Sequence, residues 1–134
     1  MSVVPNIQSQ NYAFAVVANN QDQVIGYGTT ALGEFHGWYW ENGVLTDLGT
    51  RGGSYSFAWD LNDRGQIVGE AENAAAEERA VLWQGGASYD LNDLIPADSG
   101  WVLVFAIGVN NRGQIAGVGI HDEQYRSFLL TPTR

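Results

Sequence analysis

Three aromatic residues of this sequence lie at the expected ends of strands, where an exposed ring can bind a ligand. Tyr12, Tyr55 and Trp101 each come shortly before an apolar run. An exposed ring at the end of a strand can stack on a sugar ring or pack against a protein partner, and it can also simply plug the end of the fold. We therefore treat these three residues as candidate binding residues for a carbohydrate or protein ligand.

A second set of candidate binding residues centres on Asp60, which lies inside the apolar run FAWDL at 57–61. A charge at such a position needs a partner or water. Arg51, in the preceding segment, is the candidate partner, and with Tyr55 the two would form a polar binding spot. A structural ion pair between Asp60 and Arg51 is the alternative. Trp59 is expected to face a central channel or to fill it.

The chain contains few residues for metal or covalent chemistry. It has no cysteine and only two histidines, His36 and His121, which are far apart in sequence. The turn at 62–65 resembles a calcium loop only superficially, because it lacks alternating aspartates and a bidentate glutamate. No catalytic motif is present. We expect no metal, no cofactor and no catalytic residue, so an enzyme is the least favoured function.

Charge excludes further classes of function. The 134 residues include 15 acidic side chains and 6 basic ones, all arginine, for a net charge of −9. Without a basic patch, nucleic-acid binding is not expected. No apolar run is long enough for membrane insertion, and the chain shows no signal peptide. The acidic pairs at 77–78 and 122–123 are interpreted as solvated charges.

The sequence is built from three repeats, and each contains the same turn motif. The copies are NNQDQVIG at 19–26, NDRGQIVG at 62–69 and NNRGQIAG at 110–117, spaced by 43 and 48 residues. A second motif, HGWYWENGVLTDL at 36–48, returns as RAVLWQGGASYDL at 79–91 and only as RSFLL at 126–130. We divide the chain into repeats at about 10–53, 54–101 and 102–134, of which the third lacks its last quarter.

Each repeat is predicted to form four short strands. In the second repeat these are FAWDL at 57–61, QIVGEA at 66–71, AVLWQ at 80–84 and ASYDL at 87–91. The segment 71–80 is interpreted as a long polar loop with, at most, one helical turn. Four strands at this period are typical of a β-propeller blade, and a β-sandwich or β-solenoid is the alternative. Trp40 and Trp83 occupy equivalent positions and are expected in the core.

These two motifs resemble the HAF repeat family of bacterial extracellular proteins. The resemblance is carried by HGWYWENGVLTDLGTRGG at 36–53 and NDRGQIVG at 62–69, and it covers nearly the whole chain. Three positions depart from the family pattern: Asp22 replaces a turn glycine, Arg79 a histidine and Leu130 a tryptophan. The resemblance implies an extracellular or cell-envelope location and transfers no biochemical activity.

An all-β propeller with fewer than three complete blades per chain needs a way to close. Residues 2–7 align with the fourth strand of the first repeat, so they are predicted to complete a third blade as a closing strand. Exchanged between two chains, this strand would give a homodimer with a six-bladed ring. The alternatives are a three-bladed monomer and a piece of a longer propeller. We expect a single domain over 1–134 that acts as a non-enzymatic binding or scaffold module, or alternatively as a lectin-like module.

Overall fold

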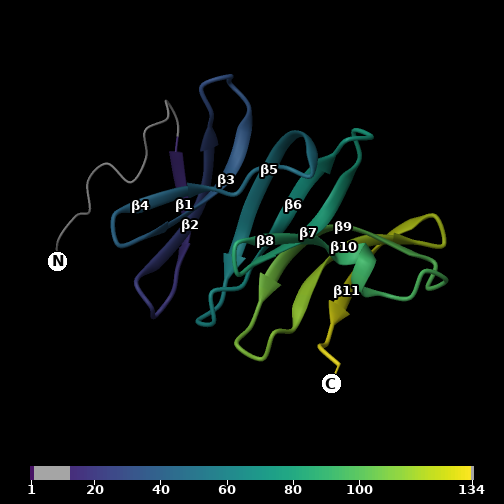
Figure 1. The fold of residues 1–134 in the computed structure, drawn as a ribbon. Coiled ribbons are helices and arrows are strands. Elements are labelled where there is room, and N and C mark those ends of the chain that lie inside the picture. Colours follow the sequence, from purple (N-terminus) through teal and green to yellow (C-terminus); the bar gives the residue numbers. More distant parts are fainter. Residues whose placement is uncertain (2–12, 134) are drawn as a thin grey trace.

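Three antiparallel sheets follow one another along the chain in the computed structural model, which describes Met1 and residues 13–133 (Figure 1). The first sheet contains β1 (Ala13–Ala18), β2 (Gln23–Thr29), β3 (Phe35–Glu41) and β4 (Val44–Asp47). The second contains β5 (Gly52–Leu61), β6 (Ile67–Asn73), β7 (Glu78–Gln84) and β8 (Ala87–Asp90). The 3₁₀ helix η1 (Leu91–Leu94) leads to the third sheet, formed by β9 (Trp101–Val109), β10 (Ile115–His121) and β11 (Gln124–Leu130).

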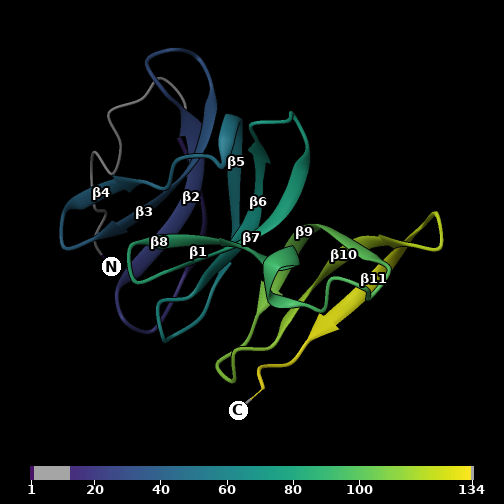
Figure 2. The ribbon, with the colours of Figure 1, turned by 45° about the vertical axis from the view of Figure 1, so that its right-hand side comes forward.

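Every sheet is a meander in which each strand pairs with the next one in sequence. Among the described residues the first two sheets have four strands and the third has three, which confirms the predicted all-β class. The second sheet stands between the other two (Figure 2). β5 packs against β1, β2 and β3, and β9 packs against β5, β6 and β7. The first strand of each sheet therefore contacts the sheet before it.

The segment 71–80 is a hairpin, so its interpretation as a long polar loop was wrong. β6 continues to Asn73 and β7 starts at Glu78. The side chain of Asn73 builds the turn, because its Oδ1 accepts hydrogen bonds from the backbone N–H groups of Ala75 and Glu77. The segment looked like a loop because the residues between Ala71 and Ala80 are mostly polar, although these two alanines are fully buried.

Two apolar layers hold the sheets together. Ile25, Ala58 and Trp83 belong to the layer between the first and second sheets. Val68, Leu103 and Phe128 belong to the layer between the second and third sheets. Trp83 is buried as predicted, whereas its counterpart Trp40 is only half-buried, and the fully buried tryptophan of the first sheet is Trp38.

One glycine of each repeat allows the first strand of its sheet to cross very close to the second. A Cβ atom at Gly26, Gly69 or Gly117 would overlap the backbone carbonyl oxygen of Phe14, Phe57 or Phe105, respectively. The strand pairing is irregular next to each of these crossings. Only glycine fits such a crossing, which explains why it recurs in all three turn motifs.

The three turn motifs are hydrogen-bonded to one another across the sheets. The side-chain amide of Asn19 donates to the carbonyl oxygen of Asn62 at 2.9 Å. The amide of Asn62 donates in the same way to the carbonyl oxygen of Asn110, also at 2.9 Å. We call this row of contacts the asparagine ladder. It fixes the relative position of the three sheets at one end of the molecule.

A second row of hydrogen bonds runs beside the first. The backbone N–H of Asn20 donates to Asp63 Oδ1 at 2.9 Å, and the backbone N–H of Asp63 donates to Asn111 Oδ1 at 2.8 Å. These bonds hold the pKa of Asp63 below its usual value, because hydrogen bonds from Asn20 and Asn111 favour the ionised carboxylate. The asparagine ladder and the backbone N–H groups of this second row donate to the turn that follows in sequence, whereas the side-chain amide of Asn111 donates back to Asp63 Oδ2 at 3.1 Å.

Candidate functional site: an acidic pocket between two sheets

A pocket of about 490 Å³ lies between the second and third sheets. Its lining residues are Trp59 on β5, Glu70 on β6, Glu78 on β7, and Phe105 and Ile107 on β9. We call it the acidic pocket. Two carboxylates and three large apolar side chains converge there, and no basic side chain lines it. Its volume lies in the range of sites for small molecules.

The polar groups of the acidic pocket are held by hydrogen bonds. The indole N–H of Trp59 donates to Glu70 Oε1 at 2.9 Å, and the hydroxyl of Tyr55 donates to Glu78 Oε2 at 3.2 Å. Phe57 stacks on Trp59 with ring centroids 5.5 Å apart and an angle of 8° between the planes. The indole ring is therefore fixed at its edge and on one face before any ligand arrives.

Glu70 is the most unusual titratable group of the pocket. It is only 9% exposed. Its pKa is raised to about 8, chiefly by burial and also by a hydrogen bond with Glu78 and the charge of Glu78, while the hydrogen bond from Trp59 acts in the opposite direction. Burial and Glu78 also raise the pKa of Tyr55, to about 12. Glu70 therefore retains a proton in most molecules at neutral pH.

The corresponding position between the first and second sheets contains aromatic rings instead of carboxylates. Tyr27 and Phe35 precede Glu70 and Glu78 by one repeat of 43 residues. Tyr27 lies edge-on to Phe57 with ring centroids 5.2 Å apart, and Phe35 stacks on Phe57 at 5.8 Å. Tyr27 also meets Trp59 edge-on at 5.6 Å. The fold therefore does not require acidic residues at this position, since rings fill it in the neighbouring copy.

Two of the sequence-predicted site residues belong to this region. Trp59 lines the acidic pocket, and Tyr55 reaches it through Glu78. Asp60 and Arg51 bond to other groups: Asp60 Oδ2 accepts from the backbone N–H of Val109 at 2.8 Å, and Arg51 donates to Ser88 Oγ at 2.9 Å. Asp60 thus connects the second sheet to the third, and Arg51 connects the loop before β5 to β8.

The remaining predicted residues lie elsewhere. Trp101, at the start of β9, stacks on His121 with ring centroids 4.8 Å apart and an angle of 12° between the planes. Tyr12 lies outside the described residues. The structure therefore gives Tyr55 and Trp101 different partners, and whether the aromatic residues bind a ligand stays a prediction.

Sequence reasoning missed four residues of the acidic pocket: Glu70, Glu78, Phe105 and Ile107. Glu78 was interpreted as part of a solvated acidic pair, but it is only partly exposed and bonds to Tyr55. The signal that identifies these glutamates is the repeat itself. Aligning the copies places Glu70 and Glu78 on Tyr27 and Phe35, so two aromatic residues on adjacent strands are replaced by acidic ones.

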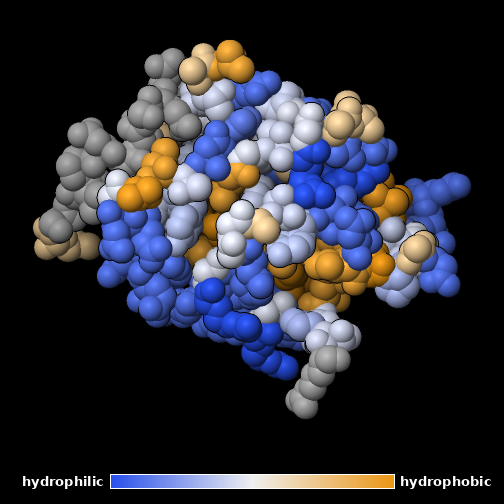
Figure 3. All heavy atoms as spheres, viewed as in Figure 1, coloured by the Kyte–Doolittle hydropathy of each residue, from blue (hydrophilic) through white to orange (hydrophobic). Residues whose placement is uncertain are grey.

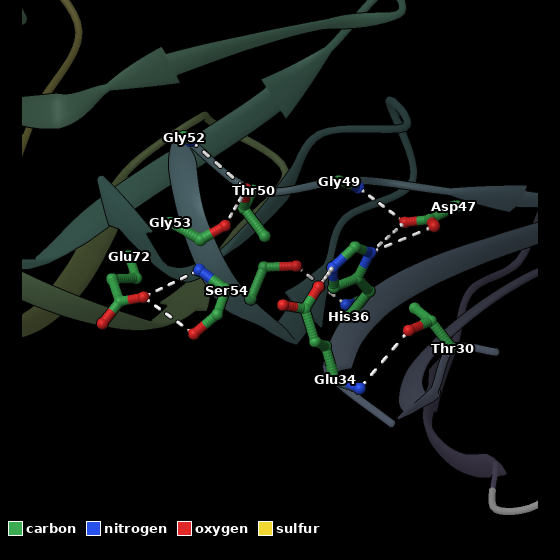
Figure 4. A network of polar contacts seen from close by, with 12 residues as sticks. Thr30, Glu34, His36, Asp47, Gly49, Thr50, Gly52, Gly53, Ser54 and Glu72 are labelled. Carbon is green, nitrogen blue, oxygen red and sulfur yellow. Dashed lines mark hydrogen bonds and ion pairs between the residues drawn. The ribbon is translucent and has the colours of Figure 1, made fainter. Parts of the chain in front are cut away.

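The histidine of the first repeat belongs to a polar network near the loops that join the first two sheets (Figure 4). His36 Nδ1 lies 2.9 Å from Asp47 Oδ1, and His36 Nε2 lies 3.6 Å from Glu34 Oε1. In the second repeat Arg79 replaces His36 and pairs with Glu77 at 3.0 Å. Because a ring and a guanidinium take the same place beside a carboxylate, we interpret His36 as a structural residue.

Comparisons with known proteins provide no relative for this chain. No family model matches it, and neither a curated protein nor a solved structure gives a significant match. Within the described part of the chain, no group of three or more histidine, cysteine or acidic residues could hold a metal ion. No helix formed by the described residues is long and apolar enough to cross a membrane.

Proposed function

We propose that this chain is a non-enzymatic binding module of the β-propeller type, and that its ligand binds in the acidic pocket. One observation carries the proposal: Glu70 and Glu78 occupy a position that Tyr27 and Phe35 fill with packed rings one repeat earlier. Burying Glu70 costs stability that an aromatic side chain would not cost. A binding role accounts for that cost.

Thermal unfolding with defined compounds tests this proposal. A panel of simple sugars, amino acids, amines and carboxylic acids is added to the wild-type protein and to the double variant Glu70→Gln/Glu78→Gln. A ligand that binds the folded state raises the melting temperature in a saturable way. We expect at least one class to do so only when the glutamates are present. Equal shifts in both proteins, no shift with any class, or turnover of a compound would contradict the proposal.

The propeller part of the proposal requires a second copy of the chain. The asparagine ladder begins at Asn19 on the first sheet and ends at Asn110 on the third. The second row of hydrogen bonds beside it begins at Asn20 and ends at Asn111. If this pattern continued into a second copy, the side-chain amide of Asn110 would donate a hydrogen bond to the carbonyl oxygen of Asn19 in that copy. Two copies joined twice in this way would close a ring of six sheets.

Exposed apolar side chains on the two outer sheets support the same assembly. Leu129 of the third sheet is 63% exposed, and Phe14 of the first sheet is 47% exposed. Their counterparts in the second sheet, Leu82 and Phe57, both pack against a neighbouring sheet or ring. A homodimer would cover the outer faces in the same manner. The closing strand predicted at 2–7 lies outside the described residues.

A lectin-like module is the second candidate function. Its support is the indole of Trp59 beside two carboxylates, since sugar rings stack on aromatic faces and their hydroxyls donate to acidic oxygens. Simple sugars in the panel distinguish this function from others. The resemblance to HAF repeat proteins adds an extracellular or cell-envelope location to the proposal, which fractionation of the native organism would test.

A further inference from the structure

We propose that the acidic pocket binds a small organic cation, whose ammonium group lies between the carboxylates of Glu70 and Glu78 and the ring of Trp59 or Phe105. This inference rests on the proposed function, because it names the chemical class of the ligand for the same site. It follows from three properties of the pocket: its charge, its walls and its supply of oxygen ligands.

The charge of the pocket favours a cation. Its lining includes two acidic side chains and no basic one. The whole chain carries a net charge of −9, so its field also attracts positively charged ligands. An anionic ligand would meet both carboxylates without any compensating group. Glu78 carries a negative charge at neutral pH and Glu70 gains one when it loses its proton, so a positively charged occupant compensates the acidic pair.

The walls of the pocket favour an organic cation over a metal ion. Trp59 and Phe105 present aromatic rings, which attract an ammonium group through their π-electrons. Calcium, in contrast, takes about six to eight oxygen ligands, and only two side chains of the pocket bear an oxygen atom. The cavity of about 490 Å³ is also far larger than a single ion.

The raised pKa of Glu70 makes the binding of a cation depend on pH. A cation interacts best with ionised Glu70, which must lose a proton with a pKa of about 8. Glu78 and Tyr55 are the other titratable groups near Glu70, and Glu72 lies near Tyr55. The residues that β9 adds to the pocket lining, Phe105 and Ile107, do not titrate. Affinity for a cation should therefore rise between about pH 6 and about pH 8.5 and then level off.

Calorimetric titration of the full chain tests the inference with two molecules of the same shape. Choline carries a trimethylammonium group, and 3,3-dimethylbutan-1-ol replaces it by a neutral tert-butyl group. We expect choline to bind about tenfold more tightly than the alcohol. The double variant Glu70→Gln/Glu78→Gln should lose this preference. The control Asp122→Asn/Glu123→Gln changes the net charge equally in an exposed turn and should bind as the wild type does.

The wild-type comparison decides the matter even if the double variant does not fold. Equal binding of choline and the alcohol, or no binding of choline up to about 10 mM, would overturn the inference. Tighter binding of calcium than of choline would overturn it as well. Binding of a sugar without binding of choline would refute the cation and leave the proposed binding function standing, so the two failures are distinguishable.

Discussion

Glu70 and Tyr27 occupy the same position in successive repeats but differ in how much of the space between neighbouring sheets they fill. Tyr27 packs against Phe14, Phe57 and Trp59, so its side chain fills the space between two sheets. Glu70 is shorter, and a pocket remains beside it between the next two sheets. The pocket and the buried acidic group thus occur together where Glu70 stands in place of the tyrosine, while the strands around both residues keep their pairing.

The raised pKa of Glu70 predicts how stability depends on pH. Between its ordinary value of 4.5 and about 8, the folded state keeps a proton that the unfolded chain has released. The contribution of this proton to stability is therefore complete below about pH 4.5 and is lost as the pH rises through 8. Replacing Glu70 by Gln removes the titration and should flatten the curve over this window.

Melting temperatures at about pH 5 and about pH 8.5 check this prediction. The wild type should lose several degrees more than Glu70→Gln, since 1 kcal/mol corresponds to about 3–5 °C for a domain of this size. Glu78 and Tyr55 remain in the variant but lose their interaction with Glu70, so the comparison reports the titration of Glu70 together with this interaction. The exposed substitution Glu123→Gln serves as control and should follow the wild type. Identical slopes for all three proteins would show that Glu70 titrates normally.

At the scale of elements, the repeat predicted the strands well and the pocket poorly. The turn at Asn62–Gly65 has a counterpart in each other copy, with Asp22 in place of the glycine in the first, and these turns interrupt the apolar runs, so the strand order follows from the sequence. Partners across sheets do not follow in the same way. Asp60 was given a side-chain partner, Arg51, but it bonds to the backbone N–H of Val109, a group that every residue but proline carries.

The hairpin of β6 and β7 shows why Glu70 and Glu78 escaped notice. Its acidic residues gave it the composition of a loop, although the two strands are continuously buried over 67–71 and 80–83. Composition reports the average over a segment, whereas burial depends on the sheets that cover both faces of a strand. Tyr55 and Trp59 were identified because aromatic residues stand out in any environment. A carboxylate stands out only against its counterparts in the other repeats.

The close crossing at Gly69 predicts an element-level sensitivity. Replacement of Gly69 by Ala would force a Cβ atom into the carbonyl group of Phe57 and separate β6 from β5. We expect a loss of about 3 kcal/mol in the free energy of unfolding, which is the cost of severe overpacking. Urea denaturation measures it. Gly108→Ala is the matched control, because the Cβ there meets only Asp60 Oδ2 at 3.8 Å. Similar losses in both variants would contradict this explanation of the repeat glycine.

At the scale of the whole molecule, the two ends of the sheet series are complementary. Apolar side chains gather over η1 and the third sheet in the view of Figure 3, next to strongly polar surfaces. The third sheet has three strands where the others have four, and the ladder ends on it with Asn110 and Asn111. The first sheet presents Phe14 and the start of the ladder. If two copies join head-to-tail through these ends, the proposed association gives either a closed ring or an open chain.

Light scattering on a sizing column distinguishes these assemblies. A closed pair of chains has a mass of about 29 kDa, twice the 14.6 kDa of one chain. Leu129→Arg places a charge on the outer face of the third sheet and should shift the protein to 14.6 kDa, because a buried unpaired charge opposes association. Val44→Arg is the control, since Val44 on β4 is 64% exposed against 63% for Leu129.

The wild type and the two variants together decide how the series of sheets closes. If the wild type and Val44→Arg run as dimers and Leu129→Arg as a folded monomer, the outer face of the third sheet is the joint between copies. A wild-type mass of 14.6 kDa would refute the dimer, and a mass that grows with concentration would indicate open chains instead of a ring. In a closed ring the two acidic pockets would be related by the two-fold axis, so a ligand with two linked ammonium groups would bind more tightly than choline only if its linker spans them.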